Sequence, residues 1–127
     1  MKSKLITLIE PRFASAIQSL AAKEMPAAAS FQLAKMLKEI RGISTDFETT
    51  RQKLIAKYGQ KDKDGNIKKD DKSRNYLLKD PKAYNKEYQD LLQVEVEHGQ
   101  IPFALIQDLT IAPDVLEALV GVVITEP

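Results

Sequence analysis

The longest periodic pattern in the chain runs from Pro26 to Tyr58, where apolar side chains recur at steps of three and four residues. Side chains at this spacing fall on one face of an α-helix, so the pattern predicts a helix over residues 26–58, about 48 Å long. Gly59 suits the end of this helix, and Gly42 marks the place where it could bend or break. The stripe consists of Leu33, Met36, Ile40, Ile43, Phe47, Leu54 and Tyr58.

This stripe admits two interpretations. It is either the core-facing side of a helical hairpin, which is the more common case, or a seam that packs on another copy or another protein. A helix of this length exceeds the width of a domain of 127 residues, so part of it is expected to project or to contact another molecule. The seven stripe residues are therefore candidate interaction residues.

A charged loop and a second helix follow the stripe. Residues 59–80 contain few apolar side chains, and Asp64-Gly65-Asn66 is a tight-turn signal, which leaves a small hairpin within the loop as an option. Asp80 before Pro81 is typical of a capped helix start and predicts a helix over residues 81–92. We expect this helix to run antiparallel to the long one, with its two tyrosines on the stripe.

The period of the pattern changes at Leu92. Apolar and polar residues then alternate as far as Glu97, which is typical of a half-buried strand. A second apolar run at residues 101–106 completes the pattern of a small β-hairpin over residues 92–106.

The two ends of the chain give shorter patterns. Residues 3–9 suit either a strand or a first helical turn, and a short helix is expected from Pro11 to Lys23. Pro113 predicts another short helix over residues 113–120. The expected fold is one α+β domain of residues 1–127, mostly α, built on the long helix and its antiparallel partner.

Charge is distributed unevenly along the chain. The 19 basic residues are almost balanced by 18 acidic ones, yet Lys86 is the last basic residue and eight acidic residues follow it. Complementary halves attract each other within one fold or between copies, and a basic surface also suits an acidic partner. Intramolecular complementarity is the simpler interpretation.

The basic residues are densest between residues 57 and 86, where tyrosines lie among them. Lysines contact phosphates and tyrosines stack on bases, so a nucleotide or a nucleic acid is a conceivable ligand of this region. Five interleaved aspartates and the absence of a recognised reading motif weigh against it. The candidate phosphate contacts are Lys57, Lys61, Lys68, Lys69 and Arg74.

Catalysis, metals and cofactors have little support in the sequence. Cysteine is absent and the one histidine, His98, lies in a predicted turn, where we expect it to be exposed to solvent. The common zinc and nucleophile constellations, glycine-rich phosphate loops and nucleophile elbows are therefore excluded. The run Asp62–Asn66 resembles the start of a calcium loop, but its glycine comes too early and the closing glutamate is missing. We expect no enzyme, no cofactor and no metal.

A membrane location is not expected either. The apolar run from Leu5 to Ile9 is shorter than a signal peptide needs, and no stretch approaches the roughly 18 apolar residues of a membrane span. The expected location is cytoplasmic.

Several segments of the chain resemble a family of small phage and prophage proteins of unknown function. The most specific part is Lys57-Tyr58-Gly59 followed by the Asp64-Gly65 turn, and the run Pro26–Lys35 and the order of the later elements fit as well. The resemblance implies phage origin, and with it a location in the host bacterial cytoplasm or the virion. It supplies no activity, so no functional residue is carried over.

Three hypotheses of function remain. The leading one is a non-enzymatic protein-interaction module that self-associates, either as a virion or assembly component or as an inhibitor of a host protein. The second is an anti-defence protein that binds a nucleotide or another small ligand, and the third is nucleic-acid binding through residues 57–86. A loop folded over a concave pocket would favour ligand binding, and a loop extended into solvent would disfavour it.

Overall fold

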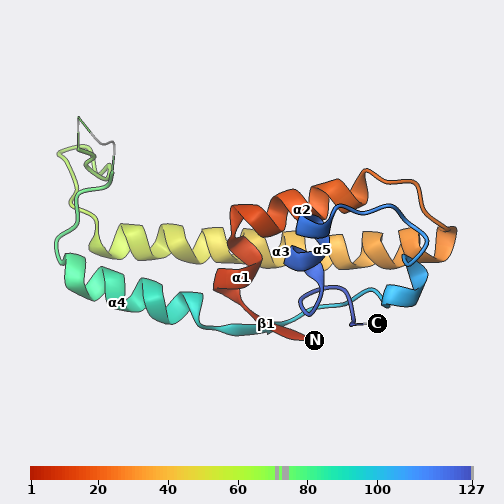
Figure 1. Ribbon diagram of the computed structural model, residues 1–127. Helices are drawn as coiled ribbons and strands as arrows, with labels where there is room; N and C mark the ends of the chain where they lie inside the picture. The colour runs from red at the N-terminus through yellow and green to blue at the C-terminus, as the bar shows by residue number, and fades with distance from the viewer. Residues whose placement is uncertain (71, 73–74, 127) are drawn as a thin grey trace.

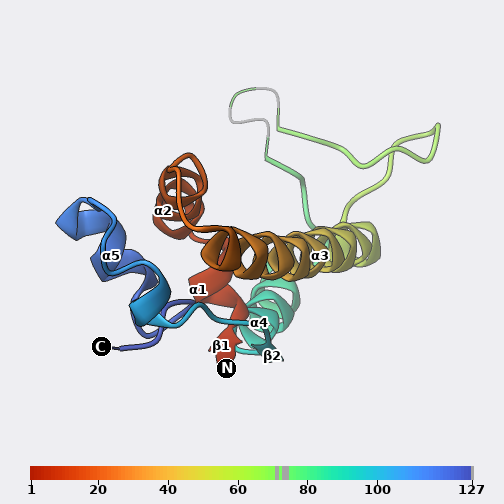
Figure 2. The ribbon, with the colours of Figure 1, turned by 90° about the vertical axis from the view of Figure 1, so that its right-hand side faces the viewer.

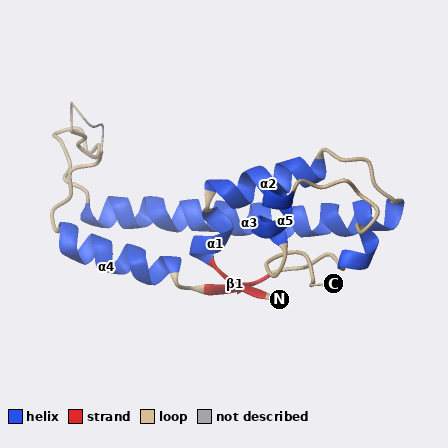
Figure 3. Cartoon of the chain, in the orientation of Figure 1, coloured by secondary structure: helices blue, strands red, loops and turns tan. Residues whose placement is uncertain are grey.

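A computed structural model describes residues 1–70, 72 and 75–126 of the chain. The fold is α+β and mostly helical, as the sequence predicts, and one helix runs almost its full length (Figures 1 and 3). The elements are β1 (Lys2–Lys4), α1 (Leu5–Ile9), α2 (Pro11–Ala21), α3 (Ala27–Tyr58), α4 (Pro81–Leu92), β2 (Glu95–Glu97), the 3₁₀ helix η1 (Phe103–Leu105) and α5 (Pro113–Leu119).

The long helix α3 is continuous through Gly42 over 32 residues. The helix ends at Gly59, where the side chain of Ile67 from the loop comes close to the backbone. A Cβ atom at Gly59 would lie 2.7 Å from the Ile55 carbonyl oxygen and 2.7 Å from Cγ2 of Ile67. Only glycine therefore lets the loop side chain of Ile67 cover the last turn of α3.

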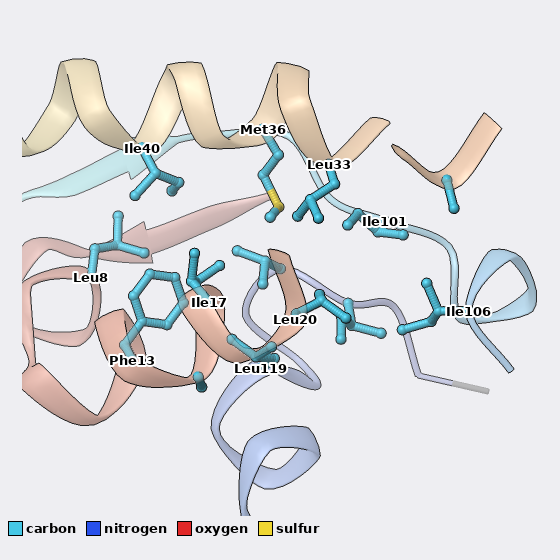
Figure 4. Packing of buried hydrophobic residues seen from close by; sticks show 14 residues of the cluster. Leu8, Phe13, Ile17, Leu20, Leu33, Met36, Ile40, Ile101, Ile106 and Leu119 are labelled. Carbon is cyan, nitrogen blue, oxygen red and sulfur yellow. The ribbon is translucent and has the colours of Figure 1, made fainter. Parts of the chain in front are cut away.

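The main core lies along the N-terminal half of α3. Leu33, Met36 and Ile40 point from α3 toward side chains of α1, α2 and the C-terminal segment (Figure 4). Figure 2 shows α2 and α5 to one side of α3 and α4 beneath it. The other members shown in Figure 4 include Leu8, Phe13, Ile17, Leu20, Ile101, Ile106 and Leu119.

The C-terminal half of α3 is covered by α4, which runs antiparallel beside it (Figure 1). The side chain of Asp80 caps α4 by accepting a hydrogen bond from the Ala83 backbone N–H at 3.1 Å. Tyr88 contacts Phe47 of α3 with ring centroids 6.4 Å apart. The predicted helical hairpin, with its tyrosines on the stripe, is confirmed.

The predicted partner of the strand at residues 95–97 is wrong. The strand itself, β2, is present, but it pairs antiparallel with β1, so that Ser3 lies opposite Val96. Residues 101–106 instead bond to the C-terminal segment: the Ile101 N–H donates to the Val123 carbonyl at 2.6 Å, and η1 follows.

Burial explains this choice of partner. Ile101 and Ile106 are almost completely buried, and a strand of an isolated two-stranded hairpin buries only one face. Pro102 also lacks the N–H group that a paired strand would use. At the N-terminus, both options open for residues 3–9 are realised, because β1 passes directly into α1.

His98 is buried rather than exposed to solvent, which corrects the expectation for it. It is 5% exposed, and its ring lies at the end of the β1–β2 pair. Nε2 lies 2.8 Å from Oγ of Ser3, and Nδ1 lies 2.8 Å from the Gly99 carbonyl oxygen. The Gly99 N–H in turn donates to the Glu39 carboxylate on α3. These bonds satisfy a buried polar ring and tie the N-terminal strand to α3.

Truncation of Leu20 should destabilise the fold strongly. This side chain is completely buried, so Leu20→Ala is expected to lower the free energy of unfolding by about 2–5 kcal/mol, measured by urea denaturation. Phe31→Ala is the matched control, because Phe31 is 70% exposed and its loss should change stability by less than about 0.5 kcal/mol. Equal effects of the two substitutions would contradict the described core.

Candidate functional site

The stripe residues of α3 lie inside the fold. Five of the seven are buried, and Ile43 and Tyr58 are half-buried. The core-facing interpretation of the stripe therefore describes this structure, and the stripe offers little free surface to a partner. Any partner of α3 must use the sides of the helix that the stripe leaves open.

One such place is an apolar groove between α2 and α3, with a volume of about 180 Å³. Its floor consists of buried core side chains, among them Phe13, Ile17 and Ile40. Its rim is formed by more exposed residues, namely Ala14, Gln18, Ala21, Leu37, Arg41 and Ser44. α2 and α3 share the core below the groove, and the rim includes the small side chains of Ala14, Ala21 and Ser44.

The one charged residue that lines this groove is Arg41, and no acidic residue lines it. In the part of the chain that the structure describes, no salt bridge involves Arg41. An apolar floor beside an unpaired cation is suited to an apolar ligand with a negative charge at its edge.

Elsewhere, the basic and acidic parts of the chain contact each other within the fold. Arg12 of α2 lies 3.3 Å from Glu117 of α5, and Lys57 of α3 lies 3.1 Å from Glu87 of α4. Lys2 lies 4.0 Å from Glu97 across the β1–β2 pair. The uneven charge distribution of the sequence is thus partly matched inside the molecule. These exposed pairs contribute little to stability individually.

The second candidate site is a cleft beneath the charged loop. The loop folds back on itself through antiparallel bridges that join Gly59 to Leu78, Lys61 to Ile67 and Lys69 to Tyr76. The turn signal at Asp64-Gly65-Asn66 forms the predicted turn: the Asp62 N–H donates to the Asn66 carbonyl, and Gly65 has φ of +82°. The loop is therefore hydrogen-bonded to itself, and its described part projects away from α3 and α4 (Figures 1 and 2).

This cleft has a volume of about 200 Å³ and lies where the loop meets α3 and α4. Arg51 and Ile55 of α3 and Tyr84 of α4 form one side, and the loop supplies Asn75, Tyr76 and Leu78. The cleft thus combines aromatic rings, aliphatic side chains and a guanidinium group. Of these residues, only Tyr76 and Tyr84 belong to the tyrosines that the sequence analysis considered for base stacking.

The candidate phosphate contacts are placed differently from one another. The Lys57 ammonium bonds to Glu87 and lies 5.1 Å from the centroid of the Tyr58 ring, so this lysine is engaged within the fold. The Lys69 ammonium lies 5.0 Å from the centroid of the Tyr76 ring, and Tyr76 lines the cleft. Lys61 and Lys68 are exposed on the loop. Arg74 lies outside the described residues.

Several residues of the two sites were not among the sequence candidates. Arg51 lines the cleft, and Arg41 and Leu37 line the groove. Arg51 stands four residues before Ile55 and seven before Tyr58, so the helical spacing already predicted that it lies on the same face of the helix as they do. The groove had no such signal, because it depends on how α2 lies against α3.

Comparison with known proteins identifies no relative. No family model matches the chain, and no curated protein and no solved structure matches it significantly. Within residues 1–70, 72 and 75–126, no helix is long and apolar enough to cross a membrane. Over the same residues, no group of three or more potential metal-ligating side chains comes together.

The Lys57–Glu87 contact can be tested through the neighbouring Tyr58. The Tyr58 hydroxyl and the Lys57 ammonium lower the pKa of the Glu87 carboxyl, and Glu87 in turn raises the pKa of Tyr58. Glu87→Gln removes the negative charge, so Tyr58 should lose its proton at lower pH than in the unsubstituted protein. NMR titration of ¹³C-labelled tyrosine measures this shift. An unchanged Tyr58 titration would show that α4 and the end of α3 do not meet as described.

Proposed function

We propose that this chain is a non-enzymatic protein-interaction module of phage origin, acting in the host cytoplasm or in the virion. Its docking surface is the groove between α2 and α3. The observation that carries the proposal is the combination of an apolar floor with a rim that has a cation and no acid. Phage origin is supported by the sequence resemblance alone.

The partner we propose is an amphipathic helix of another protein, with apolar anchors on one face and acidic residues beside them. Helices commonly bind in grooves of this kind through apolar residues three or four positions apart. Phe13 and Ile17 on α2 and Leu37 and Ile40 on α3 offer contacts to such anchors. Arg41 would meet the acidic edge of the partner helix, because it is the charged residue at the rim.

A separate protein suits this surface better than a second copy does. Five of the seven stripe residues are buried by the chain itself, which leaves little of the stripe for a second copy. Two acidic residues of α4 and α5, Glu87 and Glu117, are held by internal ion pairs. Both an assembly component and an inhibitor of a host protein are compatible with one docking groove.

The test is a selection from a random peptide display library followed by affinity measurements on the selected peptides. Selected peptides should be acidic and should have leucine-like anchors at helical spacing. Arg41→Glu should weaken their binding about tenfold or more, because it places like charges against each other. Ala14→Trp should abolish binding by filling the groove. Peptides with their acidic residues exchanged for lysine should recover affinity for Arg41→Glu.

The matched control is Lys53→Glu, which makes the same kind of charge reversal at an exposed position of α3 outside the groove. It should change peptide affinity less than about twofold at physiological salt, where distant charges are screened. A library that yields no binding peptide contradicts the proposal, and so do peptides that bind all variants equally. A dimer that Ala14→Trp dissociates would assign the groove to a second copy instead.

A further inference from the structure

We propose that the cleft beneath the charged loop binds a nucleoside phosphate, with the base between loop and helices and the phosphate at Arg51. This site is separate from the groove between α2 and α3, since the two share no lining residue. The proposal therefore stands or falls independently of the protein-docking function.

Tyr84, on the aromatic side of the cleft, packs against two other rings. It stacks on Tyr88 with the rings 7° from parallel and their centroids 5.9 Å apart. Tyr58 meets Tyr84 edge-on at 6.4 Å. Packing of this kind restricts the ring before a ligand binds, and stacking on an aromatic ring tolerates any base. Tyr76 from the loop supplies a second ring at the same cleft.

The phenol of Tyr84 is available as a neutral hydrogen-bond donor. Burial raises the pKa of Tyr84, and the nearby Arg51 partly offsets this effect. The hydroxyl therefore keeps its proton at neutral pH, where it can donate to a base or a ribose oxygen.

Arg51 forms the cationic side of the cleft. Its Nη1 donates to the Glu48 carboxylate at 2.8 Å, in an exposed pair within α3. A guanidinium has five N–H donors in a planar fork, so one bond to Glu48 leaves others for phosphate oxygens. Lys69, above the Tyr76 ring, adds a second positive charge at the loop.

The size of the cleft limits the ligand. Its volume of about 200 Å³ is below the roughly 300–1,000 Å³ of sites that enclose a whole drug-sized molecule. A single planar ring system can enter the cleft while its phosphate stays at the mouth. The ligand is therefore a small nucleotide or the end of a single-stranded nucleic acid, rather than a duplex.

Calorimetric titration with the four ribonucleoside monophosphates tests the proposal. At least one nucleotide should bind saturably, and the corresponding nucleoside and inorganic phosphate should each bind about tenfold more weakly or worse. Arg51→Gln and Tyr84→Leu should each weaken nucleotide binding about tenfold. Tyr84→Leu also removes ring packing, so the folding of this variant is checked by thermal denaturation. If Tyr84→Leu does not fold, the result for Arg51→Gln decides the proposal.

The matched control is Lys53→Gln, which removes a positive charge from the same helix, two residues beyond Arg51 and outside the cleft. It should leave nucleotide affinity within about twofold at physiological salt. A trinucleotide that binds tenfold tighter than any monomer would identify a strand end as the ligand, and equal affinity would identify the free nucleotide. The proposal is overturned if no nucleotide binds at millimolar concentration, or if Lys53→Gln weakens binding as much as Arg51→Gln does.

Discussion

The burial of the α3 stripe is the constraint on which the rest of the structure depends. An apolar stripe along 32 residues of helix is too long for any one of the other elements to cover. The N-terminal half is therefore covered by α1, α2 and the C-terminal segment, and the C-terminal half by α4 and the loop. Removing apolar surface from water is the main driving force of folding, so the other elements are arranged around this stripe.

This division of the stripe produces the two candidate sites. Where α2 lies beside α3, small side chains at the surface leave a groove over the core. Where the loop returns from Gly59 to α4, it leaves a cleft between itself and the two helices. The two sites differ in character, since one is apolar with a single cation and the other combines tyrosine rings with the Arg51 guanidinium. A protein helix and a nucleotide are the ligands that we propose for them.

The charge asymmetry has a similar explanation. Six of the eight acidic residues after Lys86 lie on α4, β2 and α5, each of which contacts an element from the basic part of the chain. Three ion pairs across these contacts match charges that are far apart in sequence. Arg41 at the groove and the described lysines of the loop take part in none of the described salt bridges.

Local patterns were sufficient for α2, α3, α4, α5 and one turn. The period of three to four residues determined α3, Asp80 with Pro81 determined the start of α4, and Asp64-Gly65-Asn66 determined the turn of the loop. These signals act through neighbouring backbone groups, so they can be recognised without knowledge of the fold. The continuity of α3 through Gly42 could not be predicted from the sequence, because the free-energy cost of one glycine is small compared with the packing of the turns around it.

Tertiary structure alone decided the strand pairing, the burial of His98 and both sites. An alternating strand indicates that it needs a partner but not which one. β2 pairs with residues 2–4, while Ile101 and Ile106 are buried in the core beside the C-terminal segment. His98 lay in a turn by sequence and became buried only when that pairing brought Ser3 to its ring. The groove and the cleft need residues from segments far apart in the chain. Their juxtaposition is a property of the packing, which no local pattern encodes.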